Sequence, residues 1–268
     1  MNKQNTKHPF AKKSFGQNFL VDERVVGKII DALNLNGYET VIEIGAGRGA
    51  LTERLLEKAG KVIAIELDRD LIPVLQARFG VFRDFRLVEA DALKTNFAEI
   101  IGKDEKVKLV ANLPYNISTA ILQRLSDQRH TFSELILMFQ REVVERITAR
   151  PGHKERGFLS VLVEAGFNSE KLFDVPGNAF RPVPMVMSSV VSLTPIDTQI
   201  DDPVLFRKIV SKGFLQKRKT IFNNFKADFK DAKELLEEIG IDPNRRAETL
   251  TLSEWISFVN SIVVRQLI

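Results

Sequence analysis

The sequence has no cysteine and only three histidines among its 268 residues. Without cysteine there is no disulfide framework, no thiolate nucleophile and no cysteine-ligated zinc site. The chain also lacks a long uncharged apolar run, which argues against a membrane span. Its N-terminus lacks the apolar core of a signal peptide. We therefore expect a cytoplasmic protein that binds neither a metal nor a membrane.

A glycine-rich turn is the first motif with a chemical meaning. The apolar run Val41 to Ile44 leads into Gly45-Ala46-Gly47-Arg48-Gly49, and a helical pattern of leucines follows. Glycines allow positive φ and let a ligand approach the backbone, and the N-terminus of the next helix offers free N–H groups. The Gly-x-Gly-x-Gly spacing differs from the Gly-x-Gly-x-x-Gly fingerprint of dinucleotide-binding proteins.

Acidic residues end the next two predicted strands. The run from Lys61 to Ile65 leads to Glu66, about twenty positions beyond the glycines, where a carboxylate can accept hydrogen bonds from the ribose hydroxyls of a nucleoside cofactor. The run from Phe85 to Ala90 leads to Asp91, which is placed to meet an adenine amino group.

The tetrapeptide Asn112-Leu113-Pro114-Tyr115 follows a fourth apolar run, from Val107 to Ala111. It supplies a side-chain amide oxygen, a proline that fixes the turn, and an aromatic face for a flipped base. Leu113 precedes proline and is therefore favoured in an extended conformation, which lets nearby carbonyls point outward as acceptors. Such acceptors suit an exocyclic amine, which has two hydrogens to be held and no acidic proton to remove.

The order of these motifs resembles the class I S-adenosylmethionine-dependent methyltransferases, and Asn-Leu-Pro-Tyr narrows the resemblance to enzymes that methylate adenine amino groups. The segment from Lys13 to Leu20 is similar to the cofactor-covering segment of the ribosomal small-subunit adenine dimethyltransferases, the KsgA family. The runs 139–147, 180–186, 218–225 and 246–250 match later motifs of that family. Met185 and Met187 depart from the pattern, since a lysine and a polar residue are usual there.

The resemblance implies a fold, an activity and a set of site residues. It implies an α/β fold of the class I methyltransferase type, Rossmann-like, with a mostly parallel seven-stranded sheet and helices on both faces, followed by a small all-helical C-terminal domain. The implied activity is dimethylation of N6 on two adjacent adenosines near the 3′ end of 16S rRNA in the small ribosomal subunit, by a monomer. The residues expected to bind the cofactor S-adenosyl-L-methionine are Gln17, Asn18, Leu20, Gly45, Gly47, Glu66, Leu67, Asp91, Ala92 and Asn112. The residues expected to hold the adenine for catalysis are Asn112, Leu113, Pro114, Tyr115 and Phe180, with Tyr115 and Phe180 stacking on its two faces.

The periodicity predicts two domains that divide near Pro195. Before it, strands alternate with helices, and the run from Ser189 to Leu193 is expected to close the sheet. The periodicity of segment 159–165 fits either a helix or a strand, and we expect a helix that continues into a strand near Phe167. After Pro195 apolar residues recur at helical spacing, with Ser253 as a predicted N-cap. We therefore expect a catalytic domain over residues 1–195 and a helical rRNA-binding domain over 196–268.

The net charge of +4 is small, but the basic residues gather in three segments. Phosphate contacts supply most of the non-specific affinity for nucleic acid, so clustered lysine and arginine beside an RNA-modification motif favour an RNA surface. Residues 212–219 lie within two helical turns, so several of their side chains are expected to share a helix face. The predicted RNA-binding residues are Lys12, Lys13, Arg150, Lys154, Arg156, Lys217, Arg218 and Lys219.

Two other functions fit parts of the pattern. One is an erythromycin-resistance methylase acting on 23S rRNA, although those enzymes usually carry isoleucine at the position of Leu113. The other is a non-catalytic RNA-binding assembly factor on the same scaffold. Loss of the glycine turn, Glu66, Asp91 or Asn112 would favour that second role, and all of them are present.

Overall fold

The computed structural model describes residues 12, 16–102 and 106–265. By its internal contacts the chain forms two compact units. Unit 1 comprises residues 1–144 and 170–195, and unit 2 comprises residues 145–169 and 196–268. The predicted division near Pro195 coincides with one of these boundaries, whereas residues 145–169 group with the C-terminal helices. The reason is their packing: Val161 and Ala165 lie in the same apolar core as the helices after Pro195.

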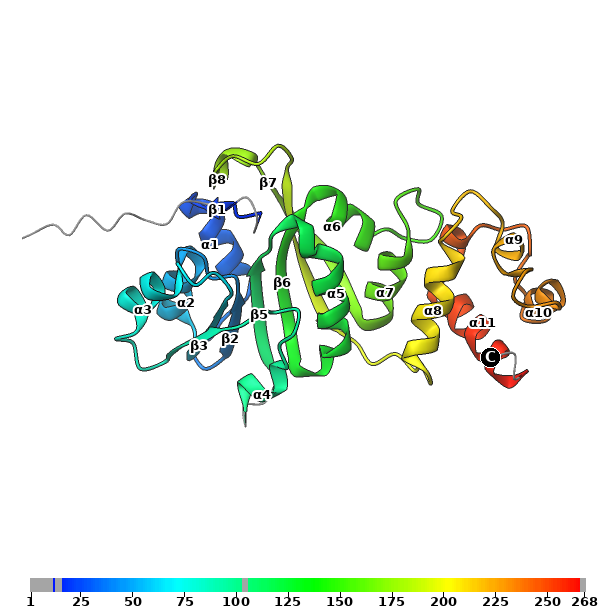
Figure 1. Ribbon diagram of the computed structural model, residues 1–268, viewed down its shortest axis with the longest axis horizontal. Coiled ribbons are helices and arrows are strands. Elements are labelled where there is room, and N and C mark those ends of the chain that lie inside the picture. The colour runs from blue at the N-terminus through cyan, green and yellow to red at the C-terminus, as the bar shows by residue number, and fades with distance from the viewer. Residues whose placement is uncertain (1–11, 13–15, 103–105, 266–268) are drawn as a thin grey trace, which may run out of the picture. The chain divides into compact units, whose positions relative to one another are not determined.

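A seven-stranded sheet has the order β4-β3-β2-β5-β6-β9-β7 (Figure 1). Its strands are β2 (Thr40–Ile44), β3 (Lys61–Glu66), β4 (Phe85–Glu89), β5 (Val107–Asn112), β6 (Phe132–Gln140), β7 (Phe167–Val175) and β9 (Ser188–Pro195). The pairs β2/β3, β3/β4, β2/β5 and β5/β6 are parallel, and β6/β9 is antiparallel. This mostly parallel sheet confirms the predicted fold. The expectation that residues 189–193 close the sheet was wrong, because β9 lies between β6 and β7.

Helices cover the sheet because its strands are apolar on both sides, as parallel strands are when both faces are buried. On one face Val41, Val62 and Ile136 pack with helices α1 (Glu23–Ala32) and α2 (Ala50–Lys58). Helix α3 (Ile72–Phe79) packs on Ala64, which has the same parity along β3 as Val62. Successive residues of a strand point to opposite faces. Ile42, Ile63 and Ile65, which point to the other face, are fully buried as well. Helix α5 (Ser118–Asp127) lies over β5 and β6 (Figure 1), and the short α4 (Phe97–Ile101) contacts β6 through a Phe97–Phe132 ring pair.

The remaining elements of unit 1 are short and lie next to the sheet. Strand β1 (Phe19–Leu20) pairs antiparallel with β8 (Phe180–Arg181). In the described part of unit 1, three single-turn helices connect longer elements: η2 (Tyr115–Ile117), η3 (Arg129–Thr131) and η4 (Gly177–Ala179). Helix α6 (Arg141–Ile147) follows β6 and crosses the boundary between the units.

Unit 2 is a helical bundle around one apolar core that contains the buried Trp255. Its elements are α7 (Phe158–Gly166), α8 (Pro203–Gly213), α9 (Ile221–Phe225), α10 (Ala232–Glu238), η5 (Ala247–Thr249) and α11 (Leu252–Val264). The predicted helix over 159–165 and the strand from Phe167 correspond to α7 and β7. The predicted N-cap at Ser253 was wrong. Thr251 caps α11 instead, because its hydroxyl accepts the Glu254 N–H while the Glu254 carboxylate accepts the Thr251 N–H.

Helix α8 ends earlier than the sequence suggested. Residues 214–218 form turns, so residues 217–219 do not share a helix face with Lys212. The Gly213 backbone lies against Trp255, and a Cβ at this position would come within 2.4 Å of the indole ring. The indole of Trp255 thus packs closely on the last turn of α8, at the residue where the helix ends. In neither unit does the described part of the chain contain a helix long and apolar enough to cross a membrane.

Candidate functional site

The carboxyl ends of β2, β3 and β5 and the residues after β4 line one cavity of about 310 Å³ in unit 1. Because neighbouring parallel strands end at the same edge of a sheet, motifs far apart in the sequence come together there. The cavity is lined by all the predicted cofactor residues, namely Gln17, Asn18, Leu20, Gly45, Gly47, Glu66, Leu67, Asp91, Ala92 and Asn112. Leu113, Pro114 and Tyr115 line it too. Its volume is at the lower end of the range for small-molecule sites.

The glycine turn forms the floor of the cavity. Gly45, Gly47 and Gly49 all have positive φ, at 73°, 59° and 84°. A Cβ at Gly47 would lie 3.3 Å from the Phe19 ring, so a side chain at this position would crowd Phe19. The turn ends at Gly49, which is the N-cap of α2. The floor of the cavity is therefore bare backbone, which suits a ligand that needs close approach.

Glu66 is almost fully buried and organises the turn through hydrogen bonds. Its Oε2 accepts the N–H of Gly47 at 2.8 Å, and its Oε1 accepts the N–H groups of Leu67 and Asp68 at 2.9 and 2.8 Å. A carboxylate has about four acceptor sites. Three are thus used by the backbone, and the remaining one lies on Oε2. Glu66 both shapes the turn and keeps acceptor capacity for a hydroxyl.

Asp91 presents a second carboxylate beyond β4. Its Oδ1 accepts the Leu93 N–H at 3.0 Å, which fixes the side chain at the start of the following turn. Within the described part of the chain no group donates to Oδ2. The cavity therefore holds carboxylate oxygens from two strand ends, together with a backbone cradle. These features fit a nucleoside cofactor, with ribose hydroxyls and an adenine amino group as donors.

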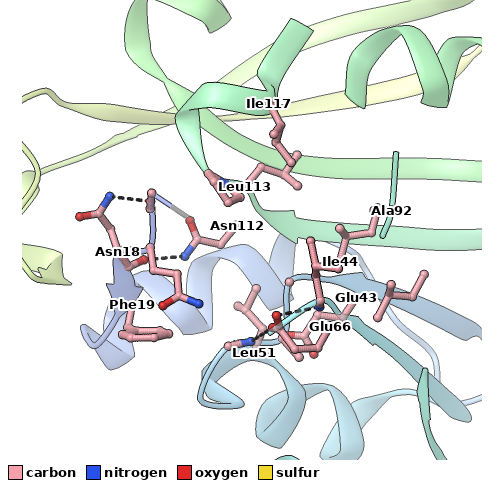
Figure 2. Close-up of a pocket in the computed structure, with 18 of the residues that line it drawn as sticks. Asn18, Phe19, Glu43, Ile44, Leu51, Glu66, Ala92, Asn112, Leu113 and Ile117 are labelled. Atoms are coloured by element: carbon pink, nitrogen blue, oxygen red, sulfur yellow. Dashed lines mark hydrogen bonds between the residues drawn. The ribbon is translucent and has the colours of Figure 1, made fainter. Parts of the chain in front are cut away.

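The Asn112 amide is oriented by the segment opposite it. Its Nδ2 donates to the carbonyl oxygen of Asn18 at 3.3 Å, and Figure 2 shows this bond at one side of the cavity, away from Glu66. Because Nδ2 is used in this way, Oδ1 remains as an acceptor. The Pro114 carbonyl accepts the Ile117 N–H at 3.3 Å. The Leu113 carbonyl is therefore the better second acceptor for an exocyclic amine.

The ring of Tyr115 is also held in place. Its hydroxyl lies 2.9 Å from the Ser188 Oγ, and Ser188 is buried at the start of β9. This bond connects the Asn-Leu-Pro-Tyr turn, which follows β5, to β9, two strands along the sheet. Tyr115 thus presents a ring of defined orientation at the cavity wall.

Phe180 does not lie where the stacking prediction needs it. It is 1% exposed, it packs in the core with Leu20 and Ala179, and it is not part of the cavity lining. Its pairing with Leu20 across β1 and β8 turns the ring into the core. In this conformation Phe180 is a core residue, and Tyr115 alone of the predicted stacking pair faces the cavity.

Sequence reasoning assigned no role to Glu43, although it lines the cavity. It is fully buried, and the Thr52 hydroxyl donates to its Oε2 at 2.6 Å. Burial raises the pKa of the Glu43 carboxyl to about 7; the Thr52 hydrogen bond opposes this shift, and the nearby Glu66 charge adds to it. An acid inside the apolar run Val41 to Ile44 was the available signal.

We expect Glu43 to make the protein less stable as the pH rises. Its pKa is raised in the folded state, so the folded protein binds the proton more tightly than the unfolded chain. The free energy of unfolding should therefore fall as the pH rises from 4.5, the ordinary pKa of a glutamate, to about 7, the pKa of Glu43 in the folded protein. The total loss is up to about 3 kcal/mol. Urea unfolding of wild type and Glu43→Gln at several pH values checks this. The difference in unfolding free energy should move in favour of the variant as the pH rises, and a constant difference would contradict it.

The predicted basic residues near the N-terminus are placed only in part. Lys13 lies outside the described residues. Lys12 Nζ pairs with Asp68 at 2.6 Å and with Asp70 at 2.7 Å. These hydrogen bonds, first to Asp68 and then to Asp70, raise the pKa of the Lys12 ammonium. Lys12 is thus engaged by carboxylates near the end of β3.

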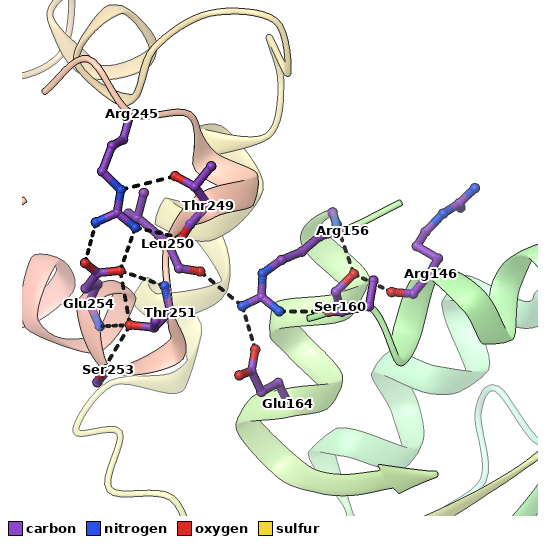
Figure 3. A network of polar contacts seen from close by, with 12 residues as sticks. Arg146, Arg156, Ser160, Glu164, Arg245, Thr249, Leu250, Thr251, Ser253 and Glu254 are labelled. Atoms are coloured by element: carbon purple, nitrogen blue, oxygen red, sulfur yellow. Dashed lines mark hydrogen bonds and ion pairs between the residues drawn. The ribbon is translucent and has the colours of Figure 1, made fainter. Parts of the chain in front are cut away.

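Arg156 is buried inside unit 2, which the sequence did not suggest. It is 1% exposed, and its guanidinium donates to the Ala149 carbonyl at 3.0 Å, the Leu250 carbonyl at 3.2 Å and the Glu164 carboxylate at 2.6 Å (Figure 3). These partners come from three segments of the unit. Arg156 therefore holds the 150–157 loop to the helices, and we leave it out of the candidate RNA surface.

The five other basic residues predicted to bind RNA in unit 2 are exposed, namely Arg150, Lys154, Lys217, Arg218 and Lys219. The Lys217 ammonium donates to the Lys154 carbonyl, so the 150–157 loop and the turn after α8 meet although they are 63 residues apart. We call these five residues the basic surface.

Known proteins resemble this chain over nearly its whole length. Residues 10–263 match the family described as "Ribosomal RNA adenine dimethylase". The chain is 43% identical to a "Ribosomal RNA small subunit methyltransferase A" of Clostridium botulinum, covering 91% of this chain and 90% of that protein. It is 40% identical to a protein of the same name from Saccharophagus degradans, covering 94% of both. Among solved structures, a dimethyladenosine transferase from Plasmodium falciparum superposes with a TM-score of 0.80 at 27% identity, covering 92% of this chain and 98% of that one. The 23S rRNA methyltransferase ErmE shares the fold, with a TM-score of 0.69 at 22% identity, covering 92% of this chain and all of that one.

Proposed function

This chain belongs to the ribosomal RNA adenine dimethylase family, and on that premise we propose that it methylates N6 of two adjacent adenosines near the 3′ end of 16S rRNA. It is an S-adenosylmethionine-dependent rRNA adenine dimethyltransferase with the class I methyltransferase fold. The observation that carries the proposal is the Asn112 to Tyr115 turn at the wall of the cavity, beside the glycine turn and two carboxylates.

The proposed cofactor residues fit S-adenosylmethionine by their chemistry. Glu66 has one acceptor site left for a ribose hydroxyl, and Asp91 Oδ2 is available to an adenine amino group. The glycine backbone provides close approach. When bound, the cofactor supplies a methyl group carried on a positively charged sulfur. The other steps depend on what the chain does with the target amine.

The proposed role of the chain in chemistry is to hold the amine as a nucleophile. The N6 lone pair is delocalised into the adenine ring, so the free amine reacts poorly. Asn112 Oδ1 and the Leu113 carbonyl accept its two hydrogens, which favours the pyramidal form and stabilises the charge that develops on nitrogen. Tyr115 stacks on the base and aligns N6. The proton leaves to water after methylation, because the methylated nitrogen makes it acidic.

Methyl transfer to purified ribosomal subunits tests the proposal. Small and large subunits from a strain that lacks this methylation are incubated with tritiated S-adenosylmethionine, and the nucleosides are analysed. We expect label in N6,N6-dimethyladenosine from the small subunit only. Label in the large subunit would favour the erythromycin-resistance type of activity. No label in either would favour a non-catalytic assembly factor. The proposed substrate places the enzyme in the cytoplasm, and we propose that it acts as a monomer.

We further propose that the basic surface binds rRNA phosphates, with unit 2 as the part that recognises the ribosomal subunit. Each lost phosphate contact should reduce the slope of log affinity against log salt by about 0.7–0.9. We therefore expect Arg150→Gln/Lys154→Gln and Lys217→Gln/Arg218→Gln/Lys219→Gln to lower this slope and to weaken subunit binding, while cofactor affinity stays unchanged. A salt titration of subunit binding measures both effects.

A control for this prediction removes the same charge elsewhere in unit 2. Lys226, Lys230 and Lys233 are exposed near α9 and α10. Their replacement by glutamine should change the slope less than the Lys217 to Lys219 variant does. Equal slopes for wild type and both basic-surface variants would show that the RNA surface lies elsewhere.

A further inference from the structure

A buried carboxylate lies just outside the cavity and takes no part in the proposed chemistry. Asp68 follows β3, is 2% exposed and does not line the cavity. It accepts hydrogen bonds from Lys12 Nζ at 2.6 Å, from Gln17 Nε2 at 2.8 Å and from the Asp70 N–H at 3.1 Å. Burial opposes ionisation, but the bonds from Lys12 and Gln17 outweigh it, so the pKa of Asp68 lies below its ordinary value. Asp68 is therefore a charged anchor for the side chains of Lys12 and Gln17.

Both the oxygen and the nitrogen of the Gln17 side-chain amide make hydrogen bonds. Its Oε1 accepts the Lys12 N–H at 2.8 Å, while its Nε2 donates to Asp68. Lys12 also pairs with Asp70, whose side chain is 62% exposed. An exposed ion pair contributes little because solvent screens it, whereas a buried charge loses much when its partner is removed. We therefore expect Asp68 to contribute most of the interaction energy that keeps Lys12 and Gln17 in place.

Asn18, the residue after Gln17, is held by the Asn112 to Tyr115 turn. The Asn18 carbonyl accepts the Asn112 Nδ2–H at 3.3 Å, and β1 begins at Phe19 (Figure 2). Asp68 follows β3 and Asn112 ends β5, and β2 lies between these two strands in the sheet. Residues 16–18 thus span the end of β2, where the glycine turn forms the cavity floor. The Phe19 ring, 3.3 Å from the position of a Gly47 Cβ, confirms that the segment passes close to this turn.

We propose that Asp68 is a positioning residue that latches residues 16–18 across the cofactor cavity through Gln17 and Lys12. The inference rests on the proposed function, since the ligand retained is S-adenosylmethionine or its demethylated product. Opening the latch requires Lys12 and Gln17 to leave a buried carboxylate, which slows cofactor release. A dimethyltransferase exchanges its cofactor after every transfer, so the latch sets the rate at which the next cofactor enters. Its strength affects exchange, whereas Asn112 and Tyr115 govern the transfer itself.

Cofactor dissociation from the full-length protein tests the latch, with S-adenosylhomocysteine as the probe in stopped-flow displacement. Asp68→Asn keeps the size of the side chain and removes its charge, and we expect dissociation to accelerate at least tenfold. Lys12→Met should accelerate dissociation as well, while leaving Asp68 in place. The double variant should be only slightly faster than Asp68→Asn alone, because both changes break the same contact and only the exposed Lys12–Asp70 pair is lost in addition. Asp70→Asn should have a smaller effect, and Arg69→Gln should have none, because Arg69 is exposed and pairs with Glu89.

The outcomes separate the latch from the site that it covers. Unchanged dissociation in both Asp68→Asn and Lys12→Met, with tight binding by wild type, overturns the latch alone. Acceleration in Asp68→Asn but not in Lys12→Met also overturns it, because the effect would then belong to the end of β3. Failure of wild type to bind the probe overturns the proposed function and the latch with it. A normal rate of a single methyl transfer in saturated Asp68→Asn supports an effect on exchange, which a general loss of structure would not spare.

Discussion

Replacing Asn112 with alanine is expected to lower the rate of methyl transfer about a hundredfold, the usual cost of losing one acceptor or donor that acts in the transition state. The structure leaves Asn112 Oδ1 as an acceptor because Nδ2 donates to the Asn18 carbonyl. The variant loses both bonds, so some cofactor affinity is lost as well. Single-turnover transfer to small subunits at saturating cofactor measures the chemical step separately from this loss.

Subunit binding provides the control for the Asn112 variant. Under the proposed role of the basic surface, phosphate contacts dominate that binding, so its affinity should hardly change. A matched variant is Asn96→Ala, which removes a similar side chain on the exposed start of α4 and should transfer methyl groups at the wild-type rate. Full activity of Asn112→Ala would refute the proposed role of its amide oxygen.

Replacing Glu66 with alanine is expected to weaken cofactor binding by roughly 1.5–3 kcal/mol, the range for a hydrogen bond to a charged group, which corresponds to a rise of about 10- to 150-fold in Kd. The variant removes the ribose acceptor. It also removes the acceptor of the Gly47, Leu67 and Asp68 N–H groups, so the glycine turn loses its support. Calorimetric titration with S-adenosylmethionine measures the change.

Two variants bracket the Glu66 result. Asp91→Ala should lower the cofactor affinity less than Glu66→Ala does, because Asp91 accepts one backbone N–H and does not support the glycine turn. Glu89→Ala should leave affinity unchanged, since Glu89 lies on β4 and pairs with the exposed Arg69. Wild-type affinity in Glu66→Ala would remove Glu66 from the site.

The local motifs were readable from the sequence because their physical causes are local. β-branched apolar runs favour buried strands, and the glycines at 45, 47 and 49 have the positive φ that their spacing suggested. The rule that parallel strands end at one edge was sufficient to bring Glu66, Asp91 and Asn112 to one cavity. The family followed from these same motifs.

The tertiary structure decided the roles of the side chains whose surroundings come from distant segments. Phe180 is buried because β8 pairs with β1, more than 150 residues away. Arg156 is buried because its partners include the Leu250 carbonyl, and Lys12 meets Asp68 across 56 residues. The local sequence around a charged or aromatic residue does not show whether its side chain faces solvent, a ligand or the core. The sequence by itself therefore determined the fold, the family and the strand-end motifs, which depend on local pattern. Only long-range packing decided which basic residues face solvent and which residues hold the segment across the cavity.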